Sequence, residues 1–444
     1  MKELKTDRTV CPKNPWLFLF IMLVMLCLIA FAQLSAFAQS GRGIPPPPST
    51  PTPTPQSKSR WGPDAKMNFG ADVYRVVFPT GYEGKRSYRL DGEKGESRRA
   101  TVSLFSNFIE QLNKAGAQGF KVKSANYGGM IIAILKPDEV QHEYDWFETT
   151  SEFAFTIDGF EEKYREATNR GFRLIDDFLV DFDCEYRDPD NVALGQDCEW
   201  HHVFLLERER GVEKPKQFIL AHDLRLGMRT GSAELTAQIK EQLANGFYPR
   251  AVFTKWEILL TQTEDSDELS TDIPEVEFVT SSFRNDVRKK VNELAKQGYK
   301  LAMIDGGAAV MYRYDKSATP VSYFWLDATK KDFEKQLAKM QENGAVYRLL
   351  YRNHNGHTIE HQLVFEQGMA VPGGGQKREY RVLKFEFRIA EDSKLKSPEK
   401  KVEIDLTPAS KETVKLMNSL AKEGFVVRDL FLTDKPSVLL ERSR

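Results

Sequence analysis

The densest group of side chains that could bind a metal is a set of three histidines, His354, His357 and His361. Three imidazoles that converge can hold Zn²⁺ and leave one position open for a catalytic water. Asn355-Gly356, between the first two, is typical of a hairpin turn. The pattern therefore predicts exposed histidines around a turn and no metal site, and a secreted metal-dependent hydrolase that uses the three histidines is the alternative.

A second group of polar side chains is acidic. Its members are Asp181, Asp183, Asp188, Asp190, Asn191 and Asp197. Calcium is bound by oxygen ligands of this kind, but the spacing lacks the central glycine and the terminal glutamate of an EF-hand loop. We expect a solvated loop here, and its length makes it the best candidate for a recognition loop.

Two cysteines flank that loop, Cys184 and Cys198, while Cys11 and Cys27 lie near the N-terminus. In an exported protein, a single remaining pair favours a disulfide. A Cys/His metal site that adds His201 and His202 is the alternative. We predict a disulfide between Cys184 and Cys198.

The sequence offers no catalytic constellation. It contains no Gly-x-Ser-x-Gly motif, and no Lys-Ser or Lys-Thr follows Gly373-Gly374-Gly375 to make a phosphate loop. The 63 Lys and Arg residues nearly balance the 64 Asp and Glu residues, which gives no electrostatic reason for a nucleic-acid partner. We expect no enzyme, no metal and no cofactor, but a binding or scaffolding protein whose partner is an unknown protein or envelope component.

The N-terminus predicts export. Basic residues precede an apolar run from Trp16 to Ala32, and Ala36-Phe37-Ala38 fits a small-x-small cleavage site before Gln39. This segment resembles a bacterial Sec-type signal peptide, so we expect a periplasmic or extracellular protein. Because the run has roughly the minimum length for spanning a bilayer, the alternative is an uncleaved anchor through residues 16–32. Only then do we expect contact with a membrane, as in an envelope-tethered sensor.

The elements that must position these side chains form an internal repeat. Six times an amphipathic helix ends at a glycine, and an aromatic residue follows the glycine in most copies. The residues four, seven and eleven positions earlier are mostly apolar, with Gln242 as the clearly polar exception. These offsets trace one stripe of a helix, and the glycine stands where a left-handed C-cap ends it. The six glycines are Gly119, Gly171, Gly246, Gly298, Gly344 and Gly424.

Each repeat is expected to be strand, helix, strand, strand. The fold class is therefore α+β, with tandem small units whose antiparallel sheets are each covered by one helix. In the first repeat we expect the helix from about Phe105 to Ala117. In the second we expect a long hairpin of 173–182 and 202–207, with the cysteines at the base of its loop. A unit of some 50 residues is marginal alone, so we expect neighbours to share a core.

The domain boundaries follow from these patterns and from composition. Prolines from Pro45 onward alternate with threonines in a segment that cannot bury a core and forms an extended spacer. The expected domains are 1–38 as signal peptide, 39–66 as Pro/Thr-rich linker, and 67–138, 139–213, 214–264, 273–316, 317–368 and 377–444 as repeats 1 to 6.

The end of each helix also resembles a known pattern. Leu294-Ala295-Lys296-Gln297-Gly298-Tyr299 and Leu420-Ala421-Lys422-Glu423-Gly424-Phe425 are similar to the L-x-x-x-G-aromatic core of a small bacterial domain of unknown function. This chain lacks the tryptophan and the following acidic residue of that core. The resemblance implies strand-helix-strand units, and it implies no activity and no catalytic residues.

Overall fold

Six times along the chain a strand, a helix and a β-hairpin build the same small unit. The three strands form an antiparallel sheet in which the last strand of the unit lies between the first and the second. The first and second strands are thus parallel to each other and the helix connects them, which is a split βαβ arrangement. The expected α+β class of tandem small units is confirmed.

The first three units follow one another from the start of the described chain. Unit 1 contains β1 (Arg75–Val77), β2 (Gly81–Glu83), α2 (Glu96–Gly116), β3 (Phe120–Tyr127) and β4 (Ile131–Pro137). Unit 2 contains β5 (His142–Ser151), α3 (Phe160–Asn169), β6 (Arg173–Tyr186) and β7 (Gln196–Glu209). Unit 3 contains β8 (Phe218–His222), α4 (Ala233–Ala244), β9 (Phe247–Val252) and β10 (Glu257–Gln262).

The last three units repeat the order, with one addition. Unit 4 contains β11 (Glu275–Thr280), α5 (Arg284–Ala295), β12 (Lys300–Asp305) and β13 (Ala308–Arg313). Unit 5 contains β14 (Val321–Asp327), α6 (Phe333–Glu342), β15 (Val346–Asn355) and β16 (Thr358–Gly368). Unit 6 contains β17 (Arg378–Lys384), β18 (Phe387–Glu391), β19 (Lys401–Leu406), α7 (Pro408–Lys422), β20 (Val426–Leu432) and β21 (Pro436–Ser443).

The computed structural model describes only part of the chain. The described residues are 73–83, 96–127, 131–151, 159–186, 196–222, 233–252, 257–262, 274–281, 284–305, 307–314, 319–355, 358–368, 378–391 and 401–443. The chain divides into two compact parts, and all the described residues belong to the second part, Met67–Arg444. The expected signal peptide and Pro/Thr-rich linker lie outside the described residues. Within these ranges, none of the helices is both long enough and apolar enough to cross a membrane.

The six glycines end their helices as expected. All six have positive φ angles, from 66° at Gly344 to 91° at Gly424. In unit 6 the N–H of Phe425 donates to the carbonyl of Leu420, and the N–H of Gly424 donates to that of Ala421. This is a Schellman motif, in which a hydrophobic contact joins the residue after the glycine to the helix. In unit 6 the residue four positions before the glycine, Leu420, and the ring after it, Phe425, belong to one apolar cluster.

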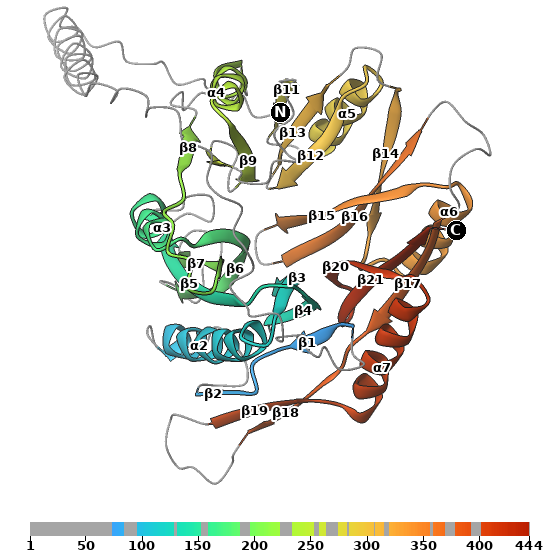
Figure 1. The fold of residues 1–444 in the computed structure, drawn as a ribbon. Coiled ribbons are helices and arrows are strands. Elements are labelled where there is room, and N and C mark those ends of the chain that lie inside the picture. The colour runs from blue at the N-terminus through green and yellow to red at the C-terminus, as the bar shows by residue number, and fades with distance from the viewer. Residues whose placement is uncertain are drawn as a thin grey trace, which may run out of the picture. The chain divides into compact units, whose positions relative to one another are not determined.

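Each sheet is buried on both faces, because neighbouring units share their cores. The helix α2 packs on its own sheet and also on residues of unit 2 such as Tyr144 and Val203. The opposite face of sheet 1, with Ile132 and Ile134, packs against unit 6. The central strands are therefore continuous apolar runs. Figure 1 shows the six helices outside the strands, following one another around them in chain order.

One polar contact joins successive units at four of the six junctions. At the first junction, Asn113 on α2 accepts a hydrogen bond from the Tyr144 N–H at 2.7 Å and donates to the Tyr144 carbonyl at 3.0 Å. The Tyr144 hydroxyl in turn accepts the N–H of Val122 at 3.0 Å. We call this arrangement the Tyr–Asn clamp. It ties the first strand of one unit to the helix and the second strand of the unit before it.

The same clamp recurs around the ring. Asn292 and Tyr323 join units 4 and 5, while Gln341 takes the place of the asparagine with Tyr380 between units 5 and 6. The last clamp joins unit 6 back to unit 1, since Asn418 Oδ1 accepts the Tyr74 N–H at 2.6 Å and the Val427 N–H donates to the Tyr74 hydroxyl at 3.2 Å. The six units therefore form a closed ring.

The two junctions of unit 3 use weaker contacts. Between units 2 and 3, the N–H of Lys216 donates to the Thr168 carbonyl at 3.0 Å. Between units 3 and 4, the N–H of Phe278 donates to the Thr236 hydroxyl at 3.2 Å. Neither junction has the paired amide contact of the clamp among the described residues. A third polar contact joins units 2 and 3, since Arg250 Nε donates to the Leu174 carbonyl at 3.0 Å.

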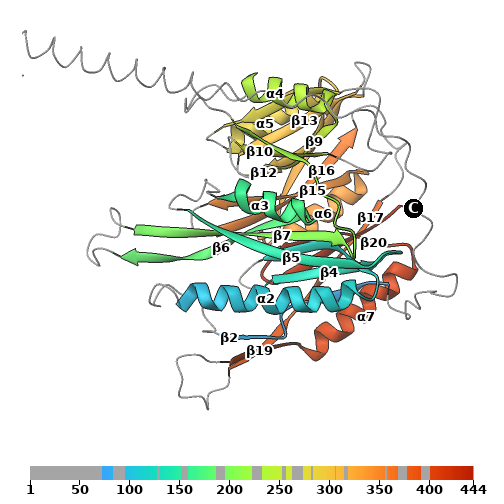
Figure 2. The same ribbon diagram turned by 60° about the vertical axis from the view of Figure 1, so that its left-hand side comes forward.

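Some elements differ from those expected. Helix α2 begins at Glu96, well before the expected Phe105, because it continues along β5, β6 and β2. The hairpin of β6 and β7 is longer than expected and extends beyond its neighbours (Figure 2). Its strands include Cys184 and Cys198, which we expected at the base of a loop.

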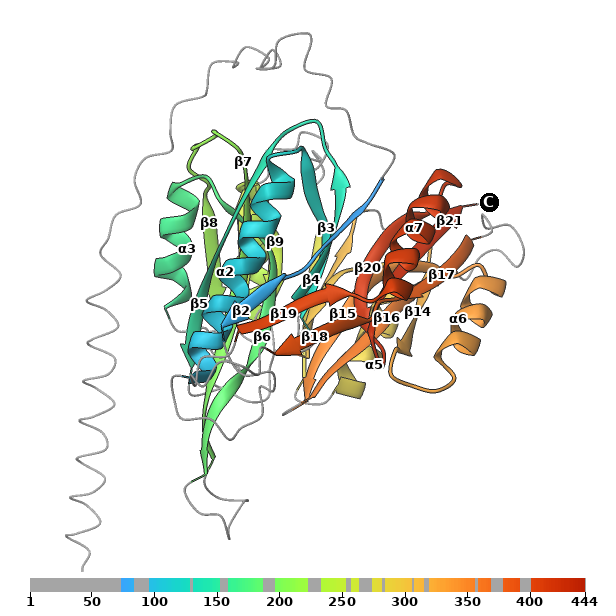
Figure 3. The same ribbon diagram turned by 90° about the horizontal axis from the view of Figure 1, so that it is seen from below.

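A seventh sheet, which the sequence analysis did not predict, combines the two ends of the ring. It has the order β18-β19-β2, so that unit 6 supplies two strands and unit 1 supplies one. Lys401 pairs with Glu83 and Glu403 pairs with Gly81 in antiparallel register. Figure 3 shows β2 beside β19. This sheet is a second connection between units 6 and 1.

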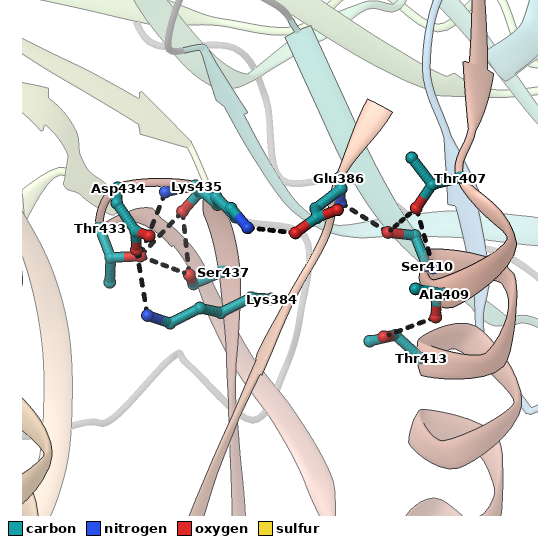
Figure 4. A network of polar contacts seen from close by, with 10 residues as sticks. All are labelled: Lys384, Glu386, Thr407, Ala409, Ser410, Thr413, Thr433, Asp434, Lys435 and Ser437. Atoms are coloured by element: carbon teal, nitrogen blue, oxygen red, sulfur yellow. Dashed lines mark hydrogen bonds and ion pairs between the residues drawn. The ribbon is translucent and has the colours of Figure 1, made fainter. Parts of the chain in front are cut away.

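A polar network fixes the start of α7 in unit 6 (Figure 4). The Thr407 hydroxyl caps the helix by accepting the Ser410 N–H at 3.2 Å, and the Ser410 hydroxyl accepts the Glu386 N–H at 2.6 Å. The Glu386 carboxylate pairs with Lys435 on the turn between β20 and β21. The network therefore has a structural role that joins the helix to its own sheet.

The clamp that closes the ring can be tested by one substitution. Asn418→Leu leaves the buried N–H and carbonyl of Tyr74 without partners, so we expect the free energy of unfolding to fall by about 2–4 kcal/mol. Urea unfolding followed by circular dichroism measures this change. The exposed Asn285 on α5 gives the control Asn285→Leu, which should change stability by less than about 0.5 kcal/mol. An equally small loss for Asn418→Leu would contradict the closed ring.

The helix-ending glycines should differ in their tolerance of alanine. Gly344 has φ +66° and open space around a Cβ, whereas a Cβ at Gly171 (φ +86°) would lie 2.8 Å from the Val212 carbonyl oxygen. We expect Gly344→Ala to cost about 1–2 kcal/mol from the left-handed backbone alone, and Gly171→Ala to cost more. Thermal unfolding compares both with Gly368→Ala, a position with open space and no positive φ. Equal melting temperatures for the alanine variants of Gly171 and Gly368 would refute this explanation.

Candidate functional site

The strand that follows the helix is the inner strand of each unit, and all six inner strands carry a β-bulge at the same place. We use "inner strands" for β3, β6, β9, β12, β15 and β20. In each of them the register with the central strand shifts at the fourth residue after the helix-ending glycine. The six bulged residues are Lys123, Ile175, Arg250, Ala302, Arg348 and Arg428. Bulges of this kind change the direction of side chains and are common beside functional sites.

The inner strands surround a pocket of about 570 Å³, which we call the axial pocket. All six of them contribute to its lining, and Glu207 on β7 is the single lining residue from another strand. The volume is within the range of about 300–1,000 Å³ that is usual for small-molecule sites. A ring of six equivalent strands thus creates one shared concave site.

Arg352 on β15 connects opposite sides of this pocket. Its guanidinium pairs with both carboxylate oxygens of Asp176 on β6, at 2.6 and 3.0 Å. It also donates to the backbone carbonyls of Asp177 at 3.2 Å and of Ala125 at 3.0 Å. Burial opposes the charge of Arg352, but Asp176 raises its pKa, so the guanidinium stays charged. One side chain of unit 5 therefore holds the open strand edges of units 1 and 2.

Asp429 on β20 is the second polar junction of the axial pocket. Its carboxylate accepts the Ser124 hydroxyl at 2.7 Å and the Tyr347 hydroxyl at 2.9 Å. Burial raises the pKa of Asp429 in spite of these donors and of Arg352. Burial and Asp429 together raise the pKa of Tyr347 well above its ordinary value, so its hydroxyl remains a donor. These contacts join units 1, 5 and 6.

Asp177 is the carboxyl group of the pocket whose protonation changes near neutral pH. Burial and the adjacent Asp176 raise its pKa from 3.8 to about 7, although Arg352 opposes the rise. The charge of the pocket therefore becomes less negative as the pH falls through neutrality.

Glu207 lies between two cations at the edge of the pocket. Its carboxylate is 3.1 Å from Arg173 Nη2 and 3.8 Å from Lys121 Nζ. His142 Nδ1 lies 3.9 Å from the other carboxylate oxygen, and the imidazole Nε2 lies 2.9 Å from Asp138. Both Glu207 and His142 are buried. This cluster joins units 1 and 2 beside the clamp of Tyr144.

The structure describes two of the three histidines that were candidates for a metal site. His354 lies on β15 and His357 is outside the described residues. His361 lies on the central strand β16, is 1% exposed, and accepts the Leu432 N–H at Nδ1 over 3.1 Å. The interpretation of an exposed turn histidine is therefore wrong for His361, because central strands are covered on both faces. Its ring is a contact between units 5 and 6.

The acidic group and the cysteines of the long hairpin are described only as backbone. Asp188, Asp190 and Asn191 lie outside the described residues, and Asp181, Asp183 and Asp197 belong to β6 and β7. The register places Cys184 directly opposite Cys198. Opposite Cα atoms in antiparallel strands are about 4.5–5.5 Å apart, which suits a disulfide. The disulfide stays a prediction, as does the Cys/His site with His201 and His202.

In the described part of the chain, no three His, Cys, Asp or Glu residues lie close enough together to hold a metal ion. No protein-family model matches this chain, and neither curated proteins nor solved structures show a match. The resemblance of the helix-end motif to a small bacterial domain thus rests on the residues alone.

The sequence analysis missed the axial pocket, although a signal for it exists. The bulged position is basic in four of the six repeats, as Lys123, Arg250, Arg348 and Arg428. Two of these four basic residues, Lys123 and Arg250, line the pocket. Aligning the repeats at this position would have found it.

The raised pKa of Asp177 makes stability depend on pH. Because the folded state binds the proton more tightly than the unfolded state, this stabilisation is complete at low pH and is lost as the pH rises through about 7. We expect the free energy of unfolding to fall on the order of 1–2 kcal/mol between pH 5 and pH 8 because of Asp177, since partial exposure screens its charge.

Asp177→Asn should remove most of this slope. Urea unfolding at several pH values compares it with the wild-type chain and with Asp286→Asn, which changes an exposed aspartate on α5. The control should keep the wild-type slope. A slope that Asp177→Asn leaves unchanged would contradict the raised pKa of Asp177.

Proposed function

We propose that this chain is an exported, non-catalytic binding protein that holds a small polar molecule in the axial pocket. The observation that carries the proposal is the pocket itself, which is lined by the same strand of every unit. Six bulges at one equivalent position support a site built for a ligand. A scaffolding role, with an unknown protein or envelope component as partner, is compatible with the same ring.

Two carboxylates of the pocket favour a binding role over a catalytic one, because both already have fixed partners. Asp176 is held by Arg352, and Asp429 accepts two hydroxyl groups. A general base needs a carboxylate that can take a proton from a substrate. The alternative of a metal-dependent hydrolase loses support because His361 is buried and accepts a backbone N–H.

The proposed location is the periplasm, the cell envelope or the outside of the cell. It rests on the N-terminal sequence, in which the apolar run of residues 16–32 precedes Ala36-Phe37-Ala38. The alternative is a membrane-anchored envelope sensor that keeps this run. A disulfide between Cys184 and Cys198 would fit an oxidising compartment.

Native mass spectrometry of the chain from its own host, prepared without reductant, tests the whole proposal. We expect a chain that starts at Gln39 and carries a small molecule. Its mass should be lower than that of the reduced chain by two hydrogen atoms, because of the disulfide. Ala251→Trp and Leu350→Trp, which fill the pocket from units 3 and 5, should fold and lose that molecule. Because Ala251 and Leu350 also pack against apolar clusters between units, circular dichroism of both variants must show the wild-type fold before their loss of the molecule counts.

Other masses or activities would support one of the alternative functions. A full-length mass would support the anchored sensor, and bound zinc together with chelator-sensitive hydrolysis would support the hydrolase. A wild-type chain without any small molecule, or one that both pocket-filling variants retain, would contradict binding in the axial pocket.

A further inference from the structure

The six units differ at one pair of equivalent positions beside the axial pocket. In each unit, the second residue after the helix-ending glycine pairs with a residue on the central strand. This central-strand residue differs between the units. In units 2, 5 and 6 it is a glutamate, namely Glu207, Glu366 and Glu441. In units 1, 3 and 4 it is Lys136, Thr261 and Tyr312.

This glutamate decides the environment of the bulged residue. In unit 5, Arg348 Nε donates to Glu366 at 2.6 Å, and in unit 6, Arg428 Nε donates to Glu441 at 2.7 Å. The bulged arginines of these units are thus neutralised within their own sheets. Neither of them belongs to the lining of the axial pocket.

Units 1 and 3 keep the basic bulged residue and lack the glutamate. Lys123 and Arg250 both line the axial pocket. In the described part of the chain, no ion pair joins either of them to a carboxylate, whereas Arg352 is paired with Asp176 and Arg173 with Glu207. The pocket therefore contains two cations that the fold does not neutralise.

The guanidinium of Arg250 is held in place and still has donors to offer. Its Nε donates to the Leu174 carbonyl at 3.0 Å, which fixes the side chain against β6. In the described part of the chain, its two Nη atoms make no hydrogen bond and no ion pair. A guanidinium fixed in this way is suited to a planar carboxylate or to a phosphate, because its parallel N–H groups match their oxygens.

Lys123 lies in surroundings that disfavour its charge. Burial lowers its pKa, the nearby cations Arg428 and Lys136 lower it further, and Asp429 opposes them. Asp429 itself is occupied by the hydroxyl groups of Ser124 and Tyr347. A bound anion would relieve the repulsion among these cations.

We propose that the axial pocket takes a small anion whose carboxylate or phosphate group is bound by Lys123 of unit 1 and Arg250 of unit 3. This inference rests on the proposed binding function and adds the chemical class of the ligand. The two side chains come from the two units whose central strand has lost the glutamate while the bulged residue stays basic. The lining also contains the carboxyl groups of Asp176, Asp177, Glu207, Asp305 and Asp429.

Isothermal titration calorimetry of the folded, exported chain tests this inference with defined probes. The probes are citrate for a carboxylate, inorganic phosphate and pyrophosphate for a phosphate, glucose as a neutral molecule and putrescine as a cation, all at low salt in a buffer without phosphate. We expect one anionic probe to bind at one site per chain. The double variant Lys123→Gln/Arg250→Gln should weaken that binding at least about tenfold, because charge-assisted hydrogen bonds are lost.

A charge-matched control separates the pocket from general electrostatics. Lys289→Gln/Lys296→Gln removes two exposed lysines on and just after α5 and should leave the affinity within about twofold of wild type. Because Arg250 also holds the edge of β6, the single variant Lys123→Gln is measured as well and should retain the wild-type melting temperature while it loses affinity. Binding of citrate alone would identify a carboxylate, and binding of the phosphates alone would identify a phosphate.

The inference is overturned if no anionic probe binds, or if the double variant and the control bind equally well. It is also overturned if glucose or putrescine binds and pocket-filling Ala251→Trp abolishes that binding. This last result would keep the proposed binding function and reject only the anion. A chain that carries no small molecule when isolated from its host would reject the binding function itself.

Discussion

A sheet that is apolar on both faces cannot be covered by a single helix, and this constraint organises the whole ring. Each unit has one helix for one face of its sheet, so the other face must pack against the preceding unit. The preceding unit covers this second face in units 2 to 6. Unit 1 has no preceding unit in the chain, and unit 6 covers the second face of its sheet. Apolar packing alone does not fix the relative position of neighbouring units. The Tyr–Asn clamp does, because a buried amide bonds both the N–H and the carbonyl of one tyrosine.

Closing the ring brings six strand edges towards one axis, where their free backbone groups need partners. Arg352 and Arg250 donate to carbonyls on these edges, and Asn126 donates to the Leu430 carbonyl. The centre of the ring is therefore polar, in contrast to the apolar cores between the sheets. The same bulge that directs Arg348 and Arg428 to their glutamates leaves Lys123 and Arg250 at the pocket. The proposed binding site thus depends on small differences between otherwise equivalent units.

Much of the fold could be predicted from local signals. The glycines mark the helix ends because only a residue without a Cβ adopts positive φ there at little cost, and the turn after Asp305 marks a hairpin between β12 and β13. The closed ring could not be predicted, because contacts such as Asn418 with Tyr74 join residues far apart in the chain. The burial of His361 could not be predicted for the same reason, because it depends on contacts with distant residues such as Leu432.

Residue-resolved amide hydrogen exchange tests the closed ring most directly. The N–H of Val427 donates to Tyr74, and the N–H of Leu430 donates to Ser124, so both amides of unit 6 are held by unit 1. If the ring is closed, these two amides exchange as slowly as the N–H groups of Val122 and Leu301, which are held at internal clamps. Fast exchange at Val427 and Leu430, with Val122 and Leu301 still protected, would mean that units 6 and 1 are not joined, and it would contradict the ring and the axial pocket within it.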